Sequence, residues 1–334
     1  MRPPDGTTQF VDLLLDGKAD EVEYSYFSWR AALFGDYDVL HIHWPELMFR
    51  DSRSRLRAFV KRRLVDLLVA RLDVKKIPIV RTYHNPRPHE RGKSAELRTL
   101  DKIDHHTTLF IALNEHTRPD AHRACTVIPH GHYVEPFARL PQVDPVGGRL
   151  VYFGIIRPYK NVETLVRVFR SLEADDMTLH VVGNPHAGQR EPLAQAAQDD
   201  PRITQILRFV DDDEMVREVR EASLVVLPYR EMRNSGALLV AMSLRRPALV
   251  PSSEVNRMLA DEFGHDWVRM YDGELTAEAL SRHLREVEGS GLLATSGPDL
   301  RARDGENVGR RHLDAYRMAI AAVERGPSAL VTAT

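Results

Sequence analysis

The sequence has one cysteine, no strong excess of charge and no long apolar run. Its single cysteine, Cys125, excludes a disulfide within the chain and fits a reducing compartment. The formal net charge of -2 at pH 7 gives no indication of nucleic-acid binding. No apolar stretch is long enough to span a bilayer, and the first residues lack the apolar core of a signal peptide. We therefore expect a cytoplasmic protein.

The sequence does have a globular composition and room for two domains. It has 334 residues, of which 43% are hydrophobic and 28% charged. Short apolar runs alternate with longer amphipathic ones, which is typical of parallel α/β units. The predicted strands are residues 39–43, 78–82, 109–113, 126–128, 149–153, 179–182, 224–227 and 248–250.

A polar segment rich in proline and glycine, residues 140–148, separates two series of strands and helices. We expect an N-terminal domain over residues 1–145 and a C-terminal domain over residues 146–310. Residues 311–334 are expected to form a helix that packs back on the N-terminal domain, followed by a frayed tail. Two doubly wound domains of this kind bind ligands at the carboxyl ends of their strands.

The first motif of the C-terminal half follows the strand at residues 149–153. Gly154 ends the strand, and Arg157 and Lys160 lie in the loop before a helix. Glycine allows a ligand to approach the backbone, and two cations beside a helix N-terminus suit a diphosphate. Asn161 is the expected N-cap of that helix. The alternative is that both cations are ordinary solvated loop charges.

The second motif lies at residues 227–239, where a strand leads through a polar turn into an apolar helix. Amides at the start of this helix are suited to phosphate oxygens. The residues expected to contribute are Asn234, Ser235, Gly236, Ala237 and Leu238. A plain capped helix is the alternative for this motif alone.

Together with residues 182–184, 228–229, 241–243 and 246–251, these motifs resemble the donor domain of GT-B glycosyltransferases. The similarity is greatest to family four and its bacterial exopolysaccharide relatives, and it covers most of residues 149–272. It implies an α/β fold of two Rossmann-like domains facing across a cleft. It also implies that Arg157, Lys160 and the loop amides contact the donor diphosphate, without metal or cofactor. Residues expected beside the nucleotide or sugar are Gly183, Tyr229, Glu231 and His130.

The sequence departs from family four at two glutamates. Met232 and Val240 stand at their positions, and Glu231 lies one position from the first. The arrangement resembles bacterial β-mannosyltransferases of polysaccharide assembly, which use GDP-mannose and invert. Inversion and retention both remain open at this point.

In the N-terminal half, polar clusters follow three predicted strands. His41 and His43 should project from the same face of their strand. Inversion requires a base for the acceptor hydroxyl, and the candidates are Glu46, His43 and His84. Trp44 and Asn85 are the expected acceptor contacts. A metal site formed by His41, His43, His84 and His89 is a less favoured alternative.

Residues 50–71 are basic and amphipathic, with an expected apolar stripe of Leu56, Phe59, Val60, Leu64, Leu67 and Leu68. A packed surface helix is one interpretation, and docking to an anionic membrane surface is the other.

The sequence thus predicts a hexosyltransferase of polysaccharide biosynthesis. It would move mannose or glucose from a GDP or UDP donor to a hydroxyl of a saccharide, a lipid-linked saccharide or a small molecule. A nucleotide-sugar epimerase and a non-catalytic binding or membrane-docking protein remain as alternatives.

Overall fold

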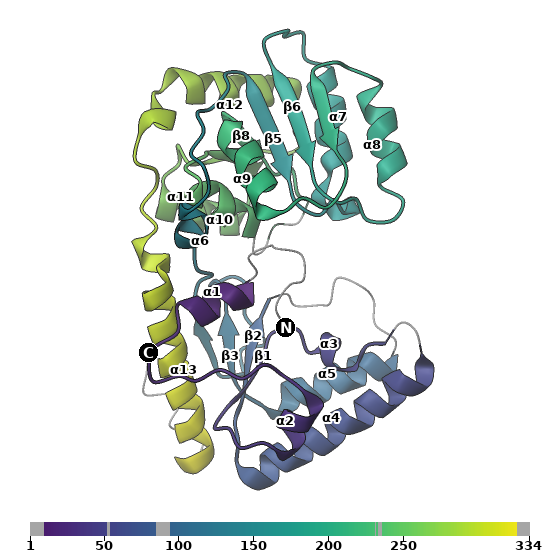
Figure 1. Ribbon diagram of the computed structural model, residues 1–334, viewed down its shortest axis with the longest axis vertical. Helices are drawn as coiled ribbons and strands as arrows, with labels where there is room; N and C mark the ends of the chain where they lie inside the picture. Colours follow the sequence, from purple (N-terminus) through teal and green to yellow (C-terminus); the bar gives the residue numbers. More distant parts are fainter. Residues whose placement is uncertain (1–9, 52–53, 85–93, 231, 233–235, 326–334) are drawn as a thin grey trace. The chain divides into compact units, whose positions relative to one another are not determined.

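The structure is a computed structural model, and it describes residues 10–51, 54–84, 94–230, 232 and 236–325. The chain divides into two compact units (Figure 1). Of the described residues, the first unit contains those of Leu14–His130 and Gly305–Arg325. The second unit contains the described residues of Gly131–Asp304 together with Phe10–Leu13. Each unit has its own parallel sheet.

The first unit is built on four parallel strands in the order β1-β2-β3-β4. They are β1 (Leu40–Ile42), β2 (Ile79–Tyr83), β3 (Thr107–Ala112) and β4 (Cys125–Val127). Ile79 and Val80 are successive residues of β2, so they point to opposite faces of the sheet. Ile79 packs with residues of α4 (Arg55–Lys75) and α5 (Ser94–His106), whereas Val80 packs with residues of α13 (Gly305–Arg325). Both faces of this sheet are therefore covered.

The last helix, α13, thus completes the first unit from the far end of the chain. Its buried residues Ala315, Tyr316 and Ala319 pack against β2 and β3. The shorter helices of the N-terminal segment are α1 (Phe10–Asp16), α2 (Trp29–Phe34) and α3 (Glu46–Phe49). None of the helices in the described part of the chain is both long enough and apolar enough to cross a membrane.

The second unit is built on six parallel strands in the order β10-β9-β8-β5-β6-β7. They are β5 (Arg149–Phe153), β6 (Thr178–Val182), β7 (Ile203–Ile206), β8 (Leu224–Val226), β9 (Ala248–Pro251) and β10 (Val268–Tyr271). The chain runs outward from β5 to β7, then returns to β8 beside β5 and runs outward the other way. The switch point between β5 and β8 is where doubly wound sheets bind ligands.

Helices connect these strands and enclose one large apolar core. They are α6 (Val134–Ala138), η1 (Pro158–Lys160), α7 (Val162–Arg170), α8 (Arg190–Ala197), α9 (Asp212–Glu221), α10 (Gly236–Ser243), α11 (Glu254–Phe263), α12 (Ala277–Gly289), η2 (Leu292–Ala294) and η3 (Arg301–Arg303). On α7 the apolar residues Val162, Leu165, Val166 and Phe169 recur at helical spacing, and all four are buried in this core.

Three local expectations need correction. The strands β7 and β10 were not predicted, because both are edge strands whose half-buried residues lack a long apolar run. Asn161 occupies the N-cap position of α7 but adopts a left-handed conformation, and its side chain does not cap the backbone. Its Oδ1 atom instead accepts a 2.8 Å hydrogen bond from the Thr164 hydroxyl.

The apolar stripe expected on the helix at residues 50–71 is mostly exposed and is not the side of the helix that packs. The buried residues of α4 are Val65, Leu68, Val69 and Leu72. The exposed apolar residues of the same helix include Leu56, Phe59, Val60 and Leu67, most of the stripe that the sequence suggested. The buried side is set by residues further along the helix, where it packs against α2, α3 and α5.

The chain passes from the first unit to the second between His130 and Gly131, earlier than the predicted boundary at residues 145 and 146. The reason is that Tyr133, Phe137 and Leu140 are buried in the core of the second unit. The return to the first unit comes at Gly305, the first residue of α13.

Candidate functional site

The loop after β5 is held in a conformation that glycine permits. Gly154 has a φ of +107° and Gly183, after β6, a φ of +148°. A Cβ atom on Gly183 would lie 2.0 Å from the carbonyl oxygen of Gly154, so no larger residue fits there. The Gly154 amide donates to the Val182 carbonyl (2.9 Å), and the Ile156 amide donates to the Asn184 carbonyl (3.0 Å). The two glycine turns therefore form one rigid backbone surface at the carboxyl edge of the sheet.

Two cations follow this surface. Arg157 precedes the 3-10 turn η1, and Lys160 is the last residue of that turn. Burial, and then the nearby Arg157 charge, lowers the pKa of Lys160 to about 8. A nearby anion favours the charged form of a lysine, so binding of an anion would raise the pKa of Lys160 and restore its charge. The chemistry of the pair suits a diphosphate, and its role as a diphosphate site stays a prediction.

The loop after β8 meets the loop after β5. The Arg230 amide donates a 2.9 Å hydrogen bond to the Tyr159 carbonyl. The Lys160 Nζ atom lies 4.9 Å from the ring centroid of Tyr229, within cation–π range. These contacts join the two loops that flank the switch point between β5 and β8.

Helix α10 begins at Gly236, directly after the second loop. The first amides of a helix point out of its N-terminus and attract anions. Gly236 and Ala237 are half-buried there, and Leu238 is fully buried. A Cβ atom on Gly236 would lie 3.6 Å from the Tyr133 hydroxyl, so that hydroxyl is close to the start of α10. Backbone dipoles and the cations of the first loop thus belong to the same edge of one sheet.

Several predicted site residues lie outside the described part of the chain. They are Asn85, Glu231, Asn234 and Ser235, and also His89 of the alternative metal site. Met232 and Val240, which stand at the two glutamate positions of family four, are buried in the apolar core of the second unit. Their side chains belong to the packing of this unit.

The polar clusters after β1 and β2 come together in the first unit. The Nδ1 atom of His43 and the Nε2 atom of His84 lie 3.5 Å apart. His84 stacks on Trp44 with ring centroids 4.5 Å apart and planes inclined by 13°. Parallel neighbouring strands place their carboxyl ends at one edge, which explains why residues so far apart in sequence meet. The predicted proximity of His41 and His43 is also confirmed, because their ring centroids lie 4.2 Å apart.

His41 is fixed at both ring nitrogens. Its Nδ1 atom shares a 2.8 Å hydrogen bond with the Tyr316 hydroxyl of α13, and its Nε2 atom shares one of 2.8 Å with the Thr82 hydroxyl. The Tyr316 hydroxyl in turn lies 3.1 Å from that of Tyr24. These hydrogen bonds fix the orientation of the His41 ring, and the His43 ring packs against it.

The histidines of this cluster are uncharged at neutral pH. Burial, followed by the nearby His312, lowers the pKa of His43 to about 3. Burial also lowers the pKa values of His41 and His84 well below the usual value, and that of His312 to about 4. A neutral imidazole has a lone pair that can accept a proton.

Glu46 and Trp44 lie beside this cluster in the chain. Glu46 begins α3. Burial lowers the pKa of Arg81 on β2, and the nearby Tyr83 and Glu46 partly oppose this shift. Trp44 is half-buried, and its ring stacks on the ring of His84. His130 belongs to the first unit, and its charge is close enough to lower the pKa of His84. Its predicted contact with the donor stays a prediction.

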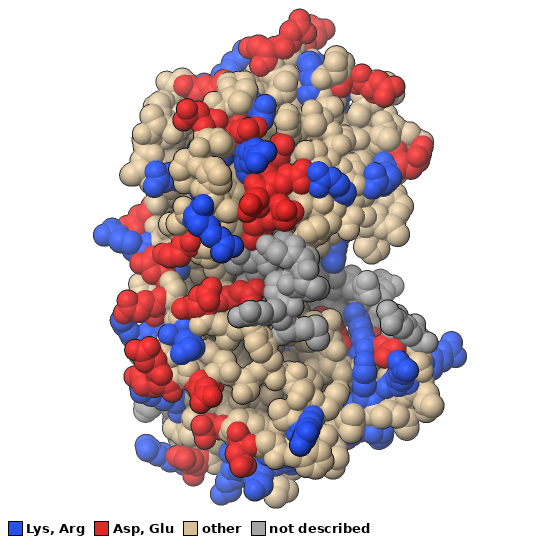
Figure 2. All heavy atoms as spheres, in the orientation of Figure 1, with Lys and Arg blue, Asp and Glu red and all other residues tan. Residues whose placement is uncertain are grey.

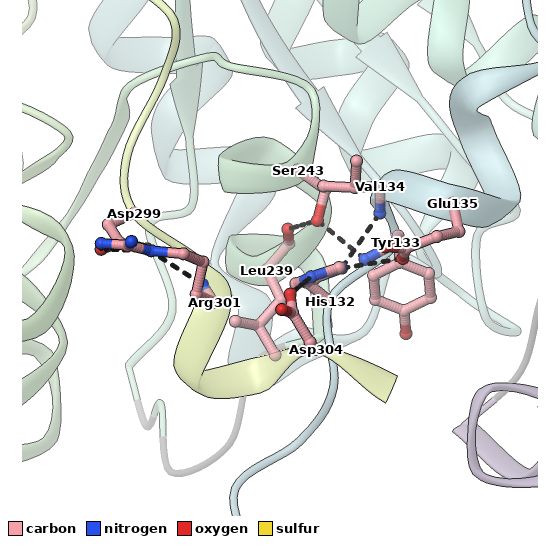
Figure 3. Close-up of polar contacts among 9 residues, drawn as sticks. All are labelled: His132, Tyr133, Val134, Glu135, Leu239, Ser243, Asp299, Arg301 and Asp304. Carbon is pink, nitrogen blue, oxygen red and sulfur yellow. Dashed lines mark hydrogen bonds and ion pairs between the residues drawn. The ribbon is translucent and has the colours of Figure 1, made fainter. Parts of the chain in front are cut away.

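A separate polar network surrounds His132 in the second unit (Figure 3). The His132 Nε2 atom lies 2.7 Å from Asp304 Oδ1, and the Val134 amide donates to His132 Nδ1 at 3.3 Å. Within the described residues, His132, Glu135 and Asp304 are the one group of three close enough to hold a metal ion. Because both ring nitrogens of His132 already have hydrogen-bond partners, the group fits a structural link between the segments at Gly131 and Asp304.

Sequence reasoning missed the contributions of α13. His312 and Tyr316 lie one helical turn apart, and both are buried on the face that packs on the sheet. Two polar aromatic residues at that spacing on the buried face of a helix were the available signal.

Comparison with known proteins places these motifs in context. A family profile described as "Glycosyl transferases group 1" matches residues 147–286, which include the loops after β5 and β8. Two curated proteins of Xanthomonas campestris pv. campestris, both named GDP-mannose:glycolipid 4-beta-D-mannosyltransferase, are each 40% identical over 320 residues. That alignment covers 96% of this chain and 90% of each relative.

Solved structures share the fold at much lower identity. AviGT4, a glycosyltransferase of avilamycin A biosynthesis, matches with a TM-score of 0.59 at 13% identity, over 96% of this chain and 92% of that one. Sucrose-phosphate synthase from Thermosynechococcus elongatus matches with a TM-score of 0.51 at 14% identity, over 90% and 73% of the two chains. Anabaena HepE in complex with UDP matches with a TM-score of 0.51 at 12% identity, over 82% and 77%.

Proposed function

Because this chain belongs to the group 1 glycosyltransferases, we propose that its donor is GDP-mannose and its acceptor a lipid-linked saccharide. The chain has the predicted α/β GT-B fold of two Rossmann-like domains. It is a hexosyltransferase that moves a hexose from a nucleotide diphosphate sugar to an acceptor hydroxyl. The 40% identity to mannosyltransferases that act on a glycolipid supports the finer assignment of donor and acceptor.

In the second unit, the observation that carries the proposal is the meeting of the two loops at the switch point between β5 and β8. Arg157, Lys160 and the first amides of α10 bind the donor diphosphate. As the bond between the sugar carbon and the diphosphate breaks, negative charge grows on the diphosphate, and these groups stabilise it. No metal is required for this step, since the protein supplies the positive charge.

In the first unit, the paired His43 and His84 supply the base. The acceptor hydroxyl oxygen forms a bond to the anomeric carbon while GDP leaves from the opposite side of the sugar. The proton of that hydroxyl passes to the imidazole pair. GDP-mannose is an α-linked donor, so the β-linkage in the names of the relatives corresponds to inversion in a single displacement. Glu46 is the alternative base, and Trp44 and Asn85 are proposed acceptor contacts.

A lipid-linked acceptor places the reaction at a membrane. We therefore infer a cytoplasmic enzyme that binds the membrane peripherally, acting in polysaccharide biosynthesis. The basic segment of residues 50–71 supports this location through its charge.

The test is transfer of mannose from GDP-mannose to detergent-solubilised bacterial glycolipid by the purified protein. We expect a β-linked product, read from the anomeric proton by NMR, and no comparable transfer from UDP-glucose. Arg157→Ala should lower kcat/KM by about 10²-fold or more, as loss of one oxyanion contact does. Arg167→Ala, an exposed residue paired with Glu163 on α7, is the matched control.

Two outcomes would contradict the proposal. Conversion of the donor sugar with no acceptor present would favour an epimerase. Tight GDP binding without transfer to any glycolipid would favour a non-catalytic sugar-nucleotide-binding protein.

A further inference from the structure

Helix α4 is apolar on two opposite faces. One face is buried against the first unit and consists of Val65, Leu68, Val69 and Leu72. The other face points to solvent and consists of Leu56, Phe59, Val60, Leu67 and Val74, with exposed fractions between 47% and 84%. At 100° per residue, the centre of this second set lies about half a turn from the centre of the buried set. An ordinary surface helix carries polar residues on that side.

The exposed apolar face is flanked by cations at its N-terminal end. From Arg55 to Arg63 the helix carries basic residues and no acidic one: Arg55, Arg57, Lys61, Arg62 and Arg63. The guanidinium carbon of Arg63 lies 5.5 Å from the ring centroid of Phe59, so charge and apolar surface are in direct contact. Figure 2 shows Lys and Arg side chains gathered at this end of α4 and α5, at the lower right.

A groove lies between α4 and α5 on the basic side of this face. Its volume is about 580 Å³, and its lining includes Arg62, Arg63, Arg98 and Lys102 against two acids, Asp66 and Asp101. Asp66 is already paired with Arg63 (3.0 Å) and with Lys102. The groove therefore keeps an excess of positive charge, which suits the phosphate of a lipid headgroup.

We propose that α4 is a bilayer-docking element, whose exposed apolar face enters the interfacial layer while the α4–α5 groove binds an anionic lipid headgroup. The combination of an apolar face with flanking Lys and Arg is that of interfacial helices. A second copy of the chain would present the same positive groove and meet like charge, so charge complementarity favours the anionic bilayer. The inference rests on the proposed function only in that a lipid-linked acceptor gives such docking a purpose.

The experiment measures vesicle binding by co-sedimentation, without sugar nucleotide or acceptor. The vesicles are phosphatidylcholine alone, or phosphatidylcholine with phosphatidylglycerol. We expect strong binding only to the second kind. Phe59→Ser combined with Leu67→Ser should weaken binding by about tenfold or more, because two apolar side chains leave the interface. Arg62→Glu combined with Arg98→Glu should abolish the preference for phosphatidylglycerol.

Matched controls are Phe209→Ser and Arg285→Glu, exposed residues of the second unit that should leave vesicle binding unchanged. The variants replace exposed side chains, with the half-buried Arg62 as the exception, and unchanged circular dichroism and Tm would confirm that they fold. Addition of soluble glycerol phosphate should not displace the protein from vesicles. Displacement by it would overturn the proposal in favour of a site for a free phosphate compound.

Two further results would overturn the proposal. One is equal binding of wild type and the apolar variant to phosphatidylglycerol vesicles. The other is a wild-type dimer that the apolar variant converts to a monomer, since the face would then be a self-association surface. Transfer to detergent-solubilised glycolipid separates this question from the proposed function. The α4 variants should keep that activity, and failure of the wild type in that assay would count against the proposed function alone.

Discussion

The ammonium group of Lys160 lies over the ring of Tyr229, with Nζ 4.9 Å from the ring centroid. The ring partly compensates for the water that Lys160 loses by burial, yet the pKa of this lysine still falls to about 8. The proposed donor site should therefore gain a proton when an anion binds, and the charge of Lys160 should change with pH near 8.

GDP affinity should therefore fall as the pH rises above about 8. Below that pH Lys160 is charged in the free protein, and above it an increasing fraction must take up a proton to bind the diphosphate. We expect about a tenfold weaker affinity for each pH unit above 8, until the pKa of the bound form is reached. Calorimetry at pH 8 in buffers of different ionisation enthalpy should detect proton uptake. In Lys160→Arg this uptake should disappear, and uptake that persists would assign the proton to another group.

Gly183→Ala should destabilise the second unit and impair donor binding together. The new Cβ atom would lie 2.0 Å from the Gly154 carbonyl oxygen, and the φ of +148° is strained for alanine. We expect a loss of about 2 to 4 kcal/mol in the free energy of unfolding, measured by urea denaturation, and a weaker affinity for GDP. Gly289→Ala is the control, because a Cβ atom there meets no heavy atom within 4 Å. Equal stability of the two variants would contradict the packing argument.

The paired imidazoles should behave as one functional unit. His43→Asn and His84→Asn should each lower kcat by about 10²- to 10⁴-fold while leaving GDP affinity unchanged, as expected for loss of a general base. The double variant should be little worse than the more damaged single one, because the two rings share one hydrogen bond. His105→Asn, at an exposed position of α5, serves as control. If Glu46→Gln alone gave the large loss of kcat, the base would be Glu46.

Acid should destabilise the first unit through its buried histidines. The pKa of His312 is about 4 in the folded state and near 6.5 in the unfolded state, so the unfolded chain binds more protons between these values. Stability is therefore full above pH 6.5 and declines as the pH falls towards 4, by about 1.4 kcal/mol per pH unit for each such histidine. His312→Gln should make this decline shallower in urea denaturation between pH 7 and pH 5. His265→Gln, at an exposed position, should not.

The sequence was sufficient to locate the central strands and loops of the second unit because their signals are local. Gly154, Arg157 and Lys160 lie within one loop, and the strand before them is a continuous buried run whose bounds were predicted as observed. A parallel sheet buried on both faces imposes such runs on its central strands. The edge strands β7 and β10 were not predicted, because a strand that is only partly buried has no such run.

The side-chain cluster of the first unit depends on contacts between residues that lie far apart in the sequence. Pairing of β1 with β2 places His43 beside His84, which the order of parallel strands made foreseeable. The bond between His41 and Tyr316 spans most of the chain, and no local pattern indicates it. On α4 the apolar residues were recognised but their side was not, because both faces of the helix are apolar and spacing alone does not say which is buried.

The position of α13 also affects the order in which the protein becomes complete during synthesis. The strands of the first sheet are synthesised before the second unit, yet the helix that covers Val80, Leu109 and Ile111 is synthesised only after it. Domains generally fold as units while the chain grows, from the N-terminal end. Here all residues of the second unit are synthesised before the first unit is complete. Until α13 is synthesised, one apolar face of the N-terminal sheet therefore stays uncovered. A chain cut before Gly305 would leave that face exposed permanently. In the growing full-length chain, chaperones could bind the uncovered face for as long as the second unit is being synthesised.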